Sequence, residues 1–281
     1  MEYFYLVSSL PSVGSIDQFA ESQINDIQNR ILNELSIEDA ENFKYLIYKN
    51  DNKNLLYVLR RKFKIKEDPL FTFHTPALFT YQELEEGILG LFELPNYMFE
   101  FLQLSKDEYN GSQTENLLIH LFYKEATSTQ NGFLSDYFHF KRDLKNIISS
   151  INARKYGYDI DKYLLDGGRI NETLRNVSSR DFGLGSGIYA FIEDLDRLLS
   201  EGKLTELEKF IDKIIIQFID SYPWVNTFSA DAVYMYFLKL SLSKRWSDLD
   251  ASKGNEEMLR SLDWVIKSAS IPSNYSMKSI T

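Results

Sequence analysis

The sequence predicts an all-α protein, and three observations support this prediction. Apolar residues recur at three- and four-residue spacing over most of the 281 residues, as they do on the buried face of an amphipathic helix. Runs with a strand-like composition are short and confined to residues 3–7 and 71–73. An amphipathic, helix-like stretch also occurs three times, at a spacing of 89 residues.

The three repeated stretches begin at Leu55, Leu144 and Val233, and apolar residues follow each of these at i+3 and i+4. Lysines fall at the same offset in all three, at positions 66, 155 and 244. A period of this length predicts one multi-helix unit used three times, with units at residues 1–112, 113–203 and 204–281. The alternative is coincidence, because amphipathic helices rich in apolar residues can often be aligned by chance.

In the first unit, Ser15 and Gln18 predict the start of a helix. Its apolar face would be formed by Ile24, Ile27, Ile31 and Leu35. Ser36 and Asp39 predict the start of a second helix, and the first repeated helix should end in the basic stretch 60–66, because positive charge suits the carbonyl end of a helix.

Thr80 and Glu83 form a capping-box pair that predicts a helix extending to Leu89. Residues 113–154 have helical periodicity, interrupted at Asn131 and Gly132. We expect a turn at residues 167–168, then helices at 188–199, with Ser186 as the N-cap, and at 204–219. The third repeated helix follows Pro223, and a last helix is predicted at 255–267.

Composition excludes several classes of protein. The chain has no cysteine, which excludes disulfides, thiolate zinc sites and a cysteine nucleophile. A formal net charge of -10 disfavours binding to nucleic acid or to anionic lipid. No apolar run approaches the ~20 residues of a membrane helix. The N-terminus has an acidic residue at position 2 and no basic segment, which argues against a signal peptide.

The sequence contains no recognisable catalytic motif. His74, His120 and His139 lack the spacing of metal ligands. The glycine-rich stretch 183–187 has neither the preceding strand nor the following Lys-Ser/Thr pair of a phosphate-binding loop. We therefore expect no catalytic residue, cofactor or metal, although an enzyme with an unrecognised site near residues 181–187 remains an alternative.

Three segments resemble a known family. They are DLKNII at residues 143–148, NARKYGY at 152–158 and YLLDGGRI at 163–170, and their order of residue types is similar to that of the C-type subunits of A/V-type rotary ATPases (ATP synthases). This family includes the d-type subunit of the eukaryotic V-ATPase. DNKNLL at 51–56, with LRRK at 59–62, is similar to the first occurrence of the same pattern. Beyond Phe228 the likeness is weak, as in a divergent bacterial branch of the family.

The resemblance implies three similar helical units in a funnel with pseudo-threefold symmetry. It further implies a non-catalytic central-stalk subunit, present in one copy, that links the central axle to the membrane rotor ring and transmits torque for ion or proton transport. Such a protein would lie at the cytoplasmic face of the membrane and contact the membrane only through the ring. The alternative function is a helical interaction scaffold unrelated to ATPases.

Basic residues at the ends of the repeated helices are the candidates for contact with partner proteins. They are Arg60, Arg61, Lys62, Arg154, Lys155, Lys244 and Arg245. A basic residue at the C-terminal end of a helix also stabilises the helix dipole, by ~0.3–1 kcal/mol. This effect accounts for the same residues without any partner protein. The sequence leaves both explanations open.

Overall fold

The computed structural model describes residues 2–12, 21–63, 73–103, 112–223 and 225–247, and this part of the chain is all-α, as predicted. The α-helices are α1 (Phe4–Ser9), α2 (Glu21–Glu34), α3 (Ile37–Lys44), α4 (Tyr48–Lys62), α5 (Tyr81–Ile88), α6 (Asn96–Leu102), α7 (Ser112–Ala126), α8 (Gly132–Tyr156), α9 (Asn171–Asn176), α10 (Ile192–Glu201), α11 (Leu204–Ser221) and α12 (Ala230–Ser247). Two short 3₁₀-helices, η3 (Ile160–Lys162) and η4 (Gly187–Tyr189), connect them.

Capping signals predicted the starts of α3 and α5 correctly, and the interruption predicted at Asn131 and Gly132 is the start of α8. The Ser36 hydroxyl accepts a hydrogen bond from the Asp39 N–H at the start of α3. Thr80 and Glu83 form the expected capping box at α5. Asn131 separates α7 from α8 and caps α8 through its side chain. These contacts join residues three positions apart, so the sequence alone contains all the information that they need.

Other sequence predictions were wrong or lie outside the described residues. Residues 4–7 belong to helix α1, not to a strand. Ser186 makes no capping bond, and α10 begins only at Ile192. The predicted first turn forms the 3₁₀-helix η4 at Gly187–Tyr189 instead, and Gly183 and Gly187 before it adopt positive φ angles of 71° and 62°. The predicted cap at positions 15 and 18, Lys66, and the helix at 255–267 lie outside the described residues.

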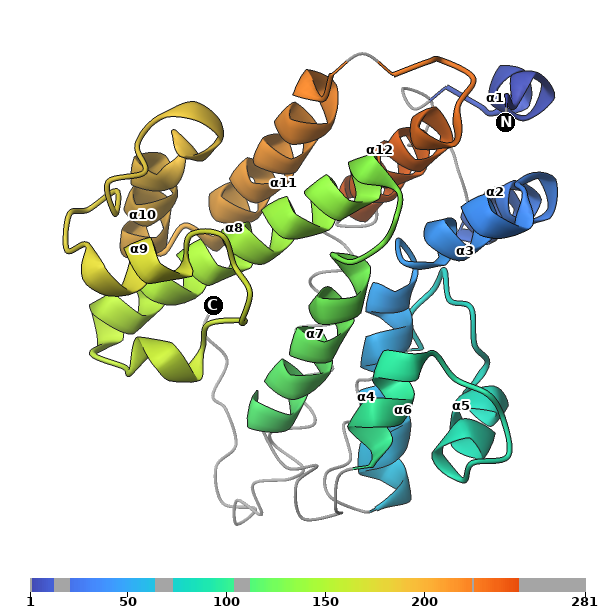
Figure 1. Ribbon diagram of the computed structural model, residues 1–281, viewed down its shortest axis with the longest axis horizontal. Coiled ribbons are helices and arrows are strands. Elements are labelled where there is room, and N and C mark those ends of the chain that lie inside the picture. Colours follow the sequence, from blue (N-terminus) through green and yellow to red (C-terminus); the bar gives the residue numbers. More distant parts are fainter. Residues whose placement is uncertain (1, 13–20, 64–72, 104–111, 224, 248–281) are drawn as a thin grey trace, which may run out of the picture.

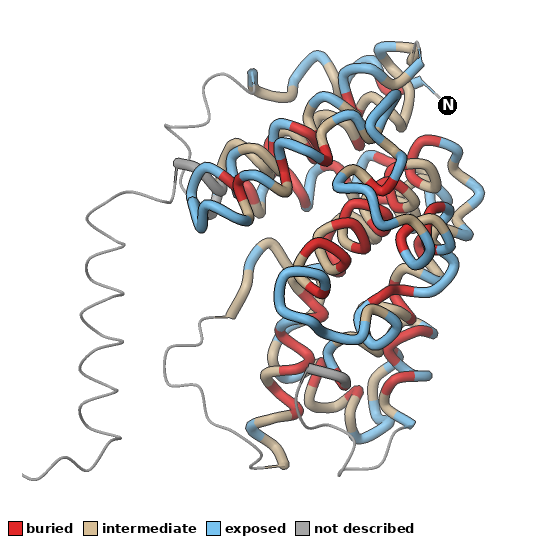
Figure 2. The backbone as a smooth tube through the Cα atoms, turned by 90° about the vertical axis from the view of Figure 1, so that its left-hand side faces the viewer, coloured by how far each residue is buried: buried red, intermediate tan, exposed pale blue. Residues whose placement is uncertain are grey.

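Helix α8 runs through the middle of the molecule (Figure 1). Helices α9 and α10 pack against it on one side, α11 packs along it, and α7 packs beside it near the α4–α6 group. Buried residues follow the inward faces of the helices, while exposed residues lie outside (Figure 2). The predicted boundaries near 112 and 203 fall between helix pairs that pack together, α6 with α7 and α10 with α11. The unit boundaries therefore stay a prediction.

The three repeated stretches all lie on helices, and most of their apolar residues are buried. Leu55 belongs to α4, Leu144 to α8 and Val233 to α12, and each is at most 2% exposed. The apolar faces predicted for these helices are therefore confirmed. A threefold rotation that relates them stays a prediction.

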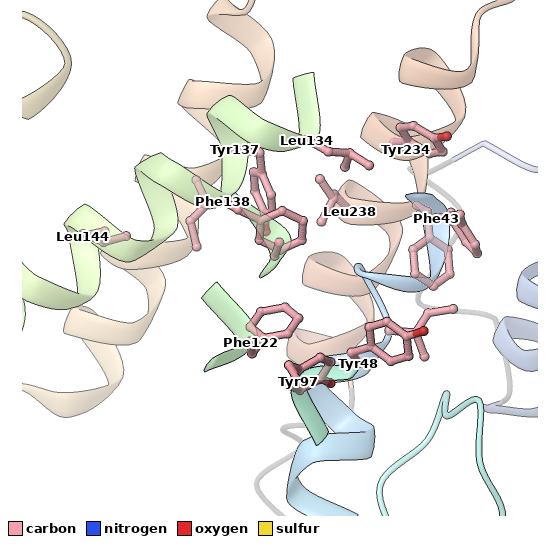
Figure 3. Packing of buried hydrophobic residues seen from close by; sticks show 14 of the residues in the cluster. Phe43, Tyr48, Tyr97, Phe122, Leu134, Tyr137, Phe138, Leu144, Tyr234 and Leu238 are labelled. Carbon is pink, nitrogen blue, oxygen red and sulfur yellow. The ribbon is translucent and has the colours of Figure 1, made fainter. Parts of the chain in front are cut away.

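Aromatic side chains join the three predicted units to one another. Phe43 of α3 packs on Phe237 of α12, with ring centroids 4.7 Å apart. The ring centroid of Tyr45 lies 6.3 Å from that of Phe138 in α8. Phe140 of α8 is stacked 4.3 Å from Phe218 of α11. Figure 3 shows side chains from α3, α4, α7, α8 and α12 within one shared core. The first unit thus contacts the third as well as the second.

Candidate functional site

Helices α4 and α8 carry the same four polar residues in the same order. KNDNKN at 49–54 corresponds to KRDLKN at 141–146, so a lysine, an aspartate, a lysine and an asparagine recur 92 residues apart. The aspartate and asparagine are three positions apart and lie close together on the helix surface, as do the two lysines, which are four apart. The aspartate–asparagine pair and the lysine pair therefore face two different parts of the structure.

The asparagines hold the backbone of the loop that follows each helix. The Asn54 side chain donates to the His74 carbonyl at 3.0 Å and accepts from the His74 N–H at 2.9 Å. Asn146 makes the same two bonds with Leu165, at 2.9 and 2.8 Å. Both asparagines are fully buried. One amide group thus satisfies both the N–H and the carbonyl of a single loop residue, half-buried His74 in the first case and buried Leu165 in the second. Without the asparagine these backbone groups would lose their partner.

The aspartates bind the same two loops four residues further on. Asp51 accepts hydrogen bonds from the N–H groups of Leu78 at 3.0 Å and Phe79 at 3.1 Å. Asp143 accepts from the Arg169 N–H at 3.2 Å and from the Tyr189 hydroxyl at 2.7 Å. We call each helix–loop connection an Asp/Asn clamp: Asp51 and Asn54 form the first, and Asp143 and Asn146 the second.

Burial dominates the electrostatics of both clamps. It raises the pKa of Asp51 to about 7, although the backbone N–H groups of Phe79 and Leu78 favour the charged form. Burial also raises the pKa of Asp143, against the opposing effects of Tyr189 and Arg142. The aspartates are therefore structural groups held at an energetic cost.

The Gly167–Gly168 turn completes the second clamp. The Asn171 side chain donates to the Leu165 carbonyl at 2.8 Å and accepts from Asn146 at 2.8 Å. A Cβ atom on Gly168 would lie 2.2 Å from the Asn171 Oδ1 atom and 2.7 Å from the Asn146 Nδ2 atom. Glycine is required at this position because the amide network occupies the space of a side chain.

The clamps show that α4 and α8 correspond at 92 residues, whereas the apolar pattern predicted 89. The difference of three residues is close to the 3.6 residues of a helical turn. Apolar faces therefore superimpose almost equally well in either register, and only the polar residues distinguish them. In α12, the positions 92 residues after the motif of α8 hold apolar side chains instead. They are Val233, Met235, Phe237 and Leu238.

The lysines of both motifs line one cavity of about 220 Å³ between α4, α7, α8 and α12. Lys49 and Lys53 come from α4, and Lys141 and Lys145 from α8. We call this space the lysine cavity. Its apolar wall includes Phe122 of α7, and Figure 3 places this ring opposite the side chains of Tyr137, Phe138 and Leu238, which also line the cavity.

Positive charge dominates the lysine cavity although the whole chain is acidic. Among the described residues that line it, Glu115 alone is acidic, and this carboxylate also lies 3.6 Å from the Arg60 guanidinium. Burial lowers the pKa of Lys145, and Glu115 raises it. Burial also lowers the pKa of His74, with further contributions from Lys53 and Lys49. A site with four lysines and apolar walls is suited to an anion.

The basic residues predicted to contact partners are not gathered at one place. Residues 60–62 end α4 and residues 154–155 end α8, at well-separated positions in Figure 1. The Arg61 guanidinium lies 5.9 Å from the Tyr81 ring centroid, and Lys62 is half-buried. Lys244 is half-buried on α12, and the side chain of Arg245 lies outside the described residues.

Arg154 and Lys155 bind their own chain. The Arg154 guanidinium donates to the carbonyls of Val177 and Ser179, and it lies 3.7 Å from the Phe182 ring centroid. The Lys155 ammonium donates to the Leu199 carbonyl near the end of α10, at 2.9 Å. These contacts give Arg154 and Lys155 a structural role within the chain. Whether any of the seven basic residues also contacts a partner stays a prediction.

Sequence reasoning overlooked Lys49, Lys53, Lys141 and Lys145. The signal that identifies them is the shared K-x-D-x-K-N pattern of α4 and α8. The resemblance to the ATPase family already paired DNKN at 51–54 with DLKN at 143–146, but nothing in the sequence singled out the lysines as a site. The pattern is visible once these two hexapeptides are compared by their polar residues alone.

The glycine-rich stretch and the histidines have local roles. The Asp181 carboxylate accepts hydrogen bonds from the N–H groups of Gly183 at 2.9 Å and Gly185 at 3.2 Å. Two amides that could face a phosphate are thus already bound to a carboxylate of the chain. His120 accepts from the Asp166 N–H at 3.4 Å. Within the described residues, no three His, Cys, Asp or Glu side chains converge as metal ligands do.

Comparison with known proteins identifies the family. Residues 1–268 match a family described as "Protein of unknown function (DUF2764)". The chain belongs to the DUF2764 family. No curated protein and no solved structure matches the chain. In the ranges that the structure describes, none of the helices of this DUF2764 protein combines the length and the apolar character needed to cross a bilayer.

Proposed function

We propose that this protein is a non-catalytic coupling component of a rotary V/A-type ATPase. In this role it links the central axle to the membrane rotor ring and passes torque between them. Its partners are axle proteins and ring proteins, and it reaches the membrane only through the ring. ATP chemistry and ion movement take place in other parts of the complex.

One observation carries the proposal: the residues that resemble the C-type ATPase family are the residues that form the second Asp/Asn clamp. The DLKN segment supplies Asp143 and Asn146, and the LLDGGR segment supplies the backbone of Leu165 and Arg169 that they bind. The likeness thus lies in two segments that depend on each other in the fold. The first clamp repeats this construction in α4, where the resemblance also recurs.

Contacts between the first and third units also support the proposal. The Tyr3 N–H donates to the Phe228 carbonyl at 2.6 Å, and the Tyr234 hydroxyl donates to the Asp39 carbonyl at 2.8 Å. In an open stack of repeats, each unit contacts only its neighbours. Contacts between all pairs of units favour a closed body over the extended scaffold of the alternative function. A closed, densely packed body is stiff, as torque transmission requires.

Affinity purification of the tagged full-length chain from detergent-solubilised membranes of its native cells tests the proposal. We expect mass spectrometry to find the axle and ring proteins of a rotary ATPase in the eluate. We also expect a chaotrope to release the chain from membranes more completely than salt does, because packed helical contacts resist screening. A chain that remains soluble in cells whose ATPase is fully assembled would contradict the proposal.

A further inference from the structure

The lysine cavity has a charge that the fold itself does not require. Asp51, Asn54, Asp143 and Asn146 secure the two loops, whereas the lysines of the same motif point to a different space. Neither Lys53 nor Lys145 forms an ion pair with a described carboxylate, and Glu115 pairs with Arg60. Lys141 and Lys145 are half-buried, while Lys49 and Lys53 are exposed. Like charges gathered around one cavity repel one another, and a bound anion relieves this repulsion.

The walls of the cavity determine which kind of anion fits. Phe122, Tyr137 and Leu238 add aromatic and aliphatic surface to the lining that the lysines share. Helix α12 contributes Leu238, an apolar residue, to the lining. The lining thus combines cationic and apolar groups, which suits a ligand with one charged end and one flat apolar end.

The size of the cavity sets an upper limit on the ligand. Its volume of about 220 Å³ equals that of about seven water molecules at ~30 Å³ each. Pockets for drug-sized ligands occupy ~300–1,000 Å³. The space therefore suits a one-ring compound or a short chain.

We propose that the lysine cavity binds a small organic anion, a carboxylate attached to a single flat apolar group. Lys53 and Lys145 contact the carboxylate, and the ring packs against Phe122 and Tyr137. This binding site is independent of the proposed coupling function, because it is formed within the isolated chain.

Ligand-observed NMR and calorimetry on the purified full-length chain test this proposal with phenylacetate as the probe. We expect saturable binding with a Kd between about 0.1 and 5 mM, the range for a small ligand with one ring and one charge. The neutral isostere phenylacetamide should bind at least about tenfold more weakly, which corresponds to about 1.4 kcal/mol. Inorganic phosphate, which lacks the apolar group, should not displace phenylacetate at equal concentration.

Matched variants locate the binding site. Lys53→Met with Lys145→Met keeps the apolar stems and removes both charges, and it should weaken phenylacetate binding at least about tenfold. Lys53→Arg with Lys145→Arg should retain binding within about threefold, because the charges remain. Lys213→Met removes an exposed charge from α11 and should have no effect. Circular dichroism confirms that each variant is folded.

Three results would overturn the proposal. They are the absence of saturable phenylacetate binding, equal affinity for phenylacetate and phenylacetamide, and unchanged binding by a folded Lys53→Met/Lys145→Met variant. None of these results depends on axle or ring proteins. The coupling function and the anion site can therefore fail separately.

Discussion

Asn54 and Asn146 lie 92 residues apart in the chain, and each binds both the N–H and the carbonyl of one residue in the loop that follows its helix. In each case an aspartate three positions earlier binds an N–H group four residues further along that loop. The short helices α5 and α9 then begin two or three residues later. The first two units therefore share one construction, in which a buried polar pair joins a long helix to a returning segment.

Replacing either asparagine should destabilise the protein strongly. We expect Asn54→Ala and Asn146→Ala each to lower the free energy of unfolding by about 2–4 kcal/mol, because two hydrogen bonds are lost and buried backbone groups remain without partners. Urea denaturation followed by circular dichroism measures the effect. Asn176→Ala, at an exposed position on α9, is the control and should change stability by less than about 0.5 kcal/mol. A loss below about 1 kcal/mol for both clamp variants would contradict the structural role of the clamps.

Gly168 should tolerate no side chain while the second clamp is intact. Gly168→Ala is expected to cost about 1–3 kcal/mol, because its Cβ atom would displace the side chains of Asn146 and Asn171. Gly157→Ala is a useful comparison, since it strains a residue at φ 67° with no atom within 4 Å of the new Cβ and should cost about 1 kcal/mol.

A double-mutant cycle separates the two causes. If the clash acts through the amide network, Gly168→Ala should cost less in the Asn171→Ala background than in the wild type, because the closest clash is with the Asn171 side chain. Additive effects of these two substitutions would show that the network is not what excludes a side chain at position 168.

The buried Asp51 should make stability fall as the pH rises. Its pKa is about 7 in the folded protein and 3.8 in a model compound, so the folded state retains a proton that the unfolded state has lost between these values. The folded state binds more protons in this range, and the free energy of unfolding therefore decreases from about pH 4 to pH 7.

Asp51→Asn removes this titration and leaves an oxygen to accept a backbone hydrogen bond. Relative to the variant, the wild type should lose up to about 2–3 kcal/mol of stability between pH 5 and pH 8. Urea denaturation of both proteins at a series of pH values measures the difference in their free energies of unfolding. The contributions of the other titrating groups are common to both proteins and cancel in this difference. Parallel stability curves for the two proteins would refute the assignment.

Arg154 should contribute to stability whether or not it also contacts a partner. Arg154→Met removes the bonds to the Val177 and Ser179 carbonyls, and we expect a loss of about 1–2 kcal/mol. Arg60→Met removes only a partly exposed ion pair with Glu115 and should cost less than about 1 kcal/mol. Thermal or urea unfolding compares the two variants directly. An Arg154→Met protein as stable as the wild type would return Arg154 to the candidates for a purely intermolecular role.

The sequence by itself determined the helical class and the starts of several helices. Ser36, Thr80 and Asn131 each cap a helix through a partner three residues away, and the apolar faces of α2, α4 and α8 follow from spacing within each helix. Such interactions are local, so the pattern that predicts them is complete within a few residues. The basic helix ends were also found from the sequence, but their contacts with the chain itself were not.

Only the tertiary structure decided the register of the repeat, the start of α10 and the position of the candidate site. A shift of three residues nearly preserves an amphipathic face, so apolar periodicity cannot distinguish a repeat spacing of 89 residues from one of 92. The hydrogen bonds from Asn54 and Asn146 to specific backbone atoms do distinguish them. The lysine cavity depends on Lys53 and Lys145, which lie 92 residues apart in the sequence and line one space because α4 and α8 pack around the same core. Proximity of this kind results from packing across the whole chain, and no local pattern encodes it.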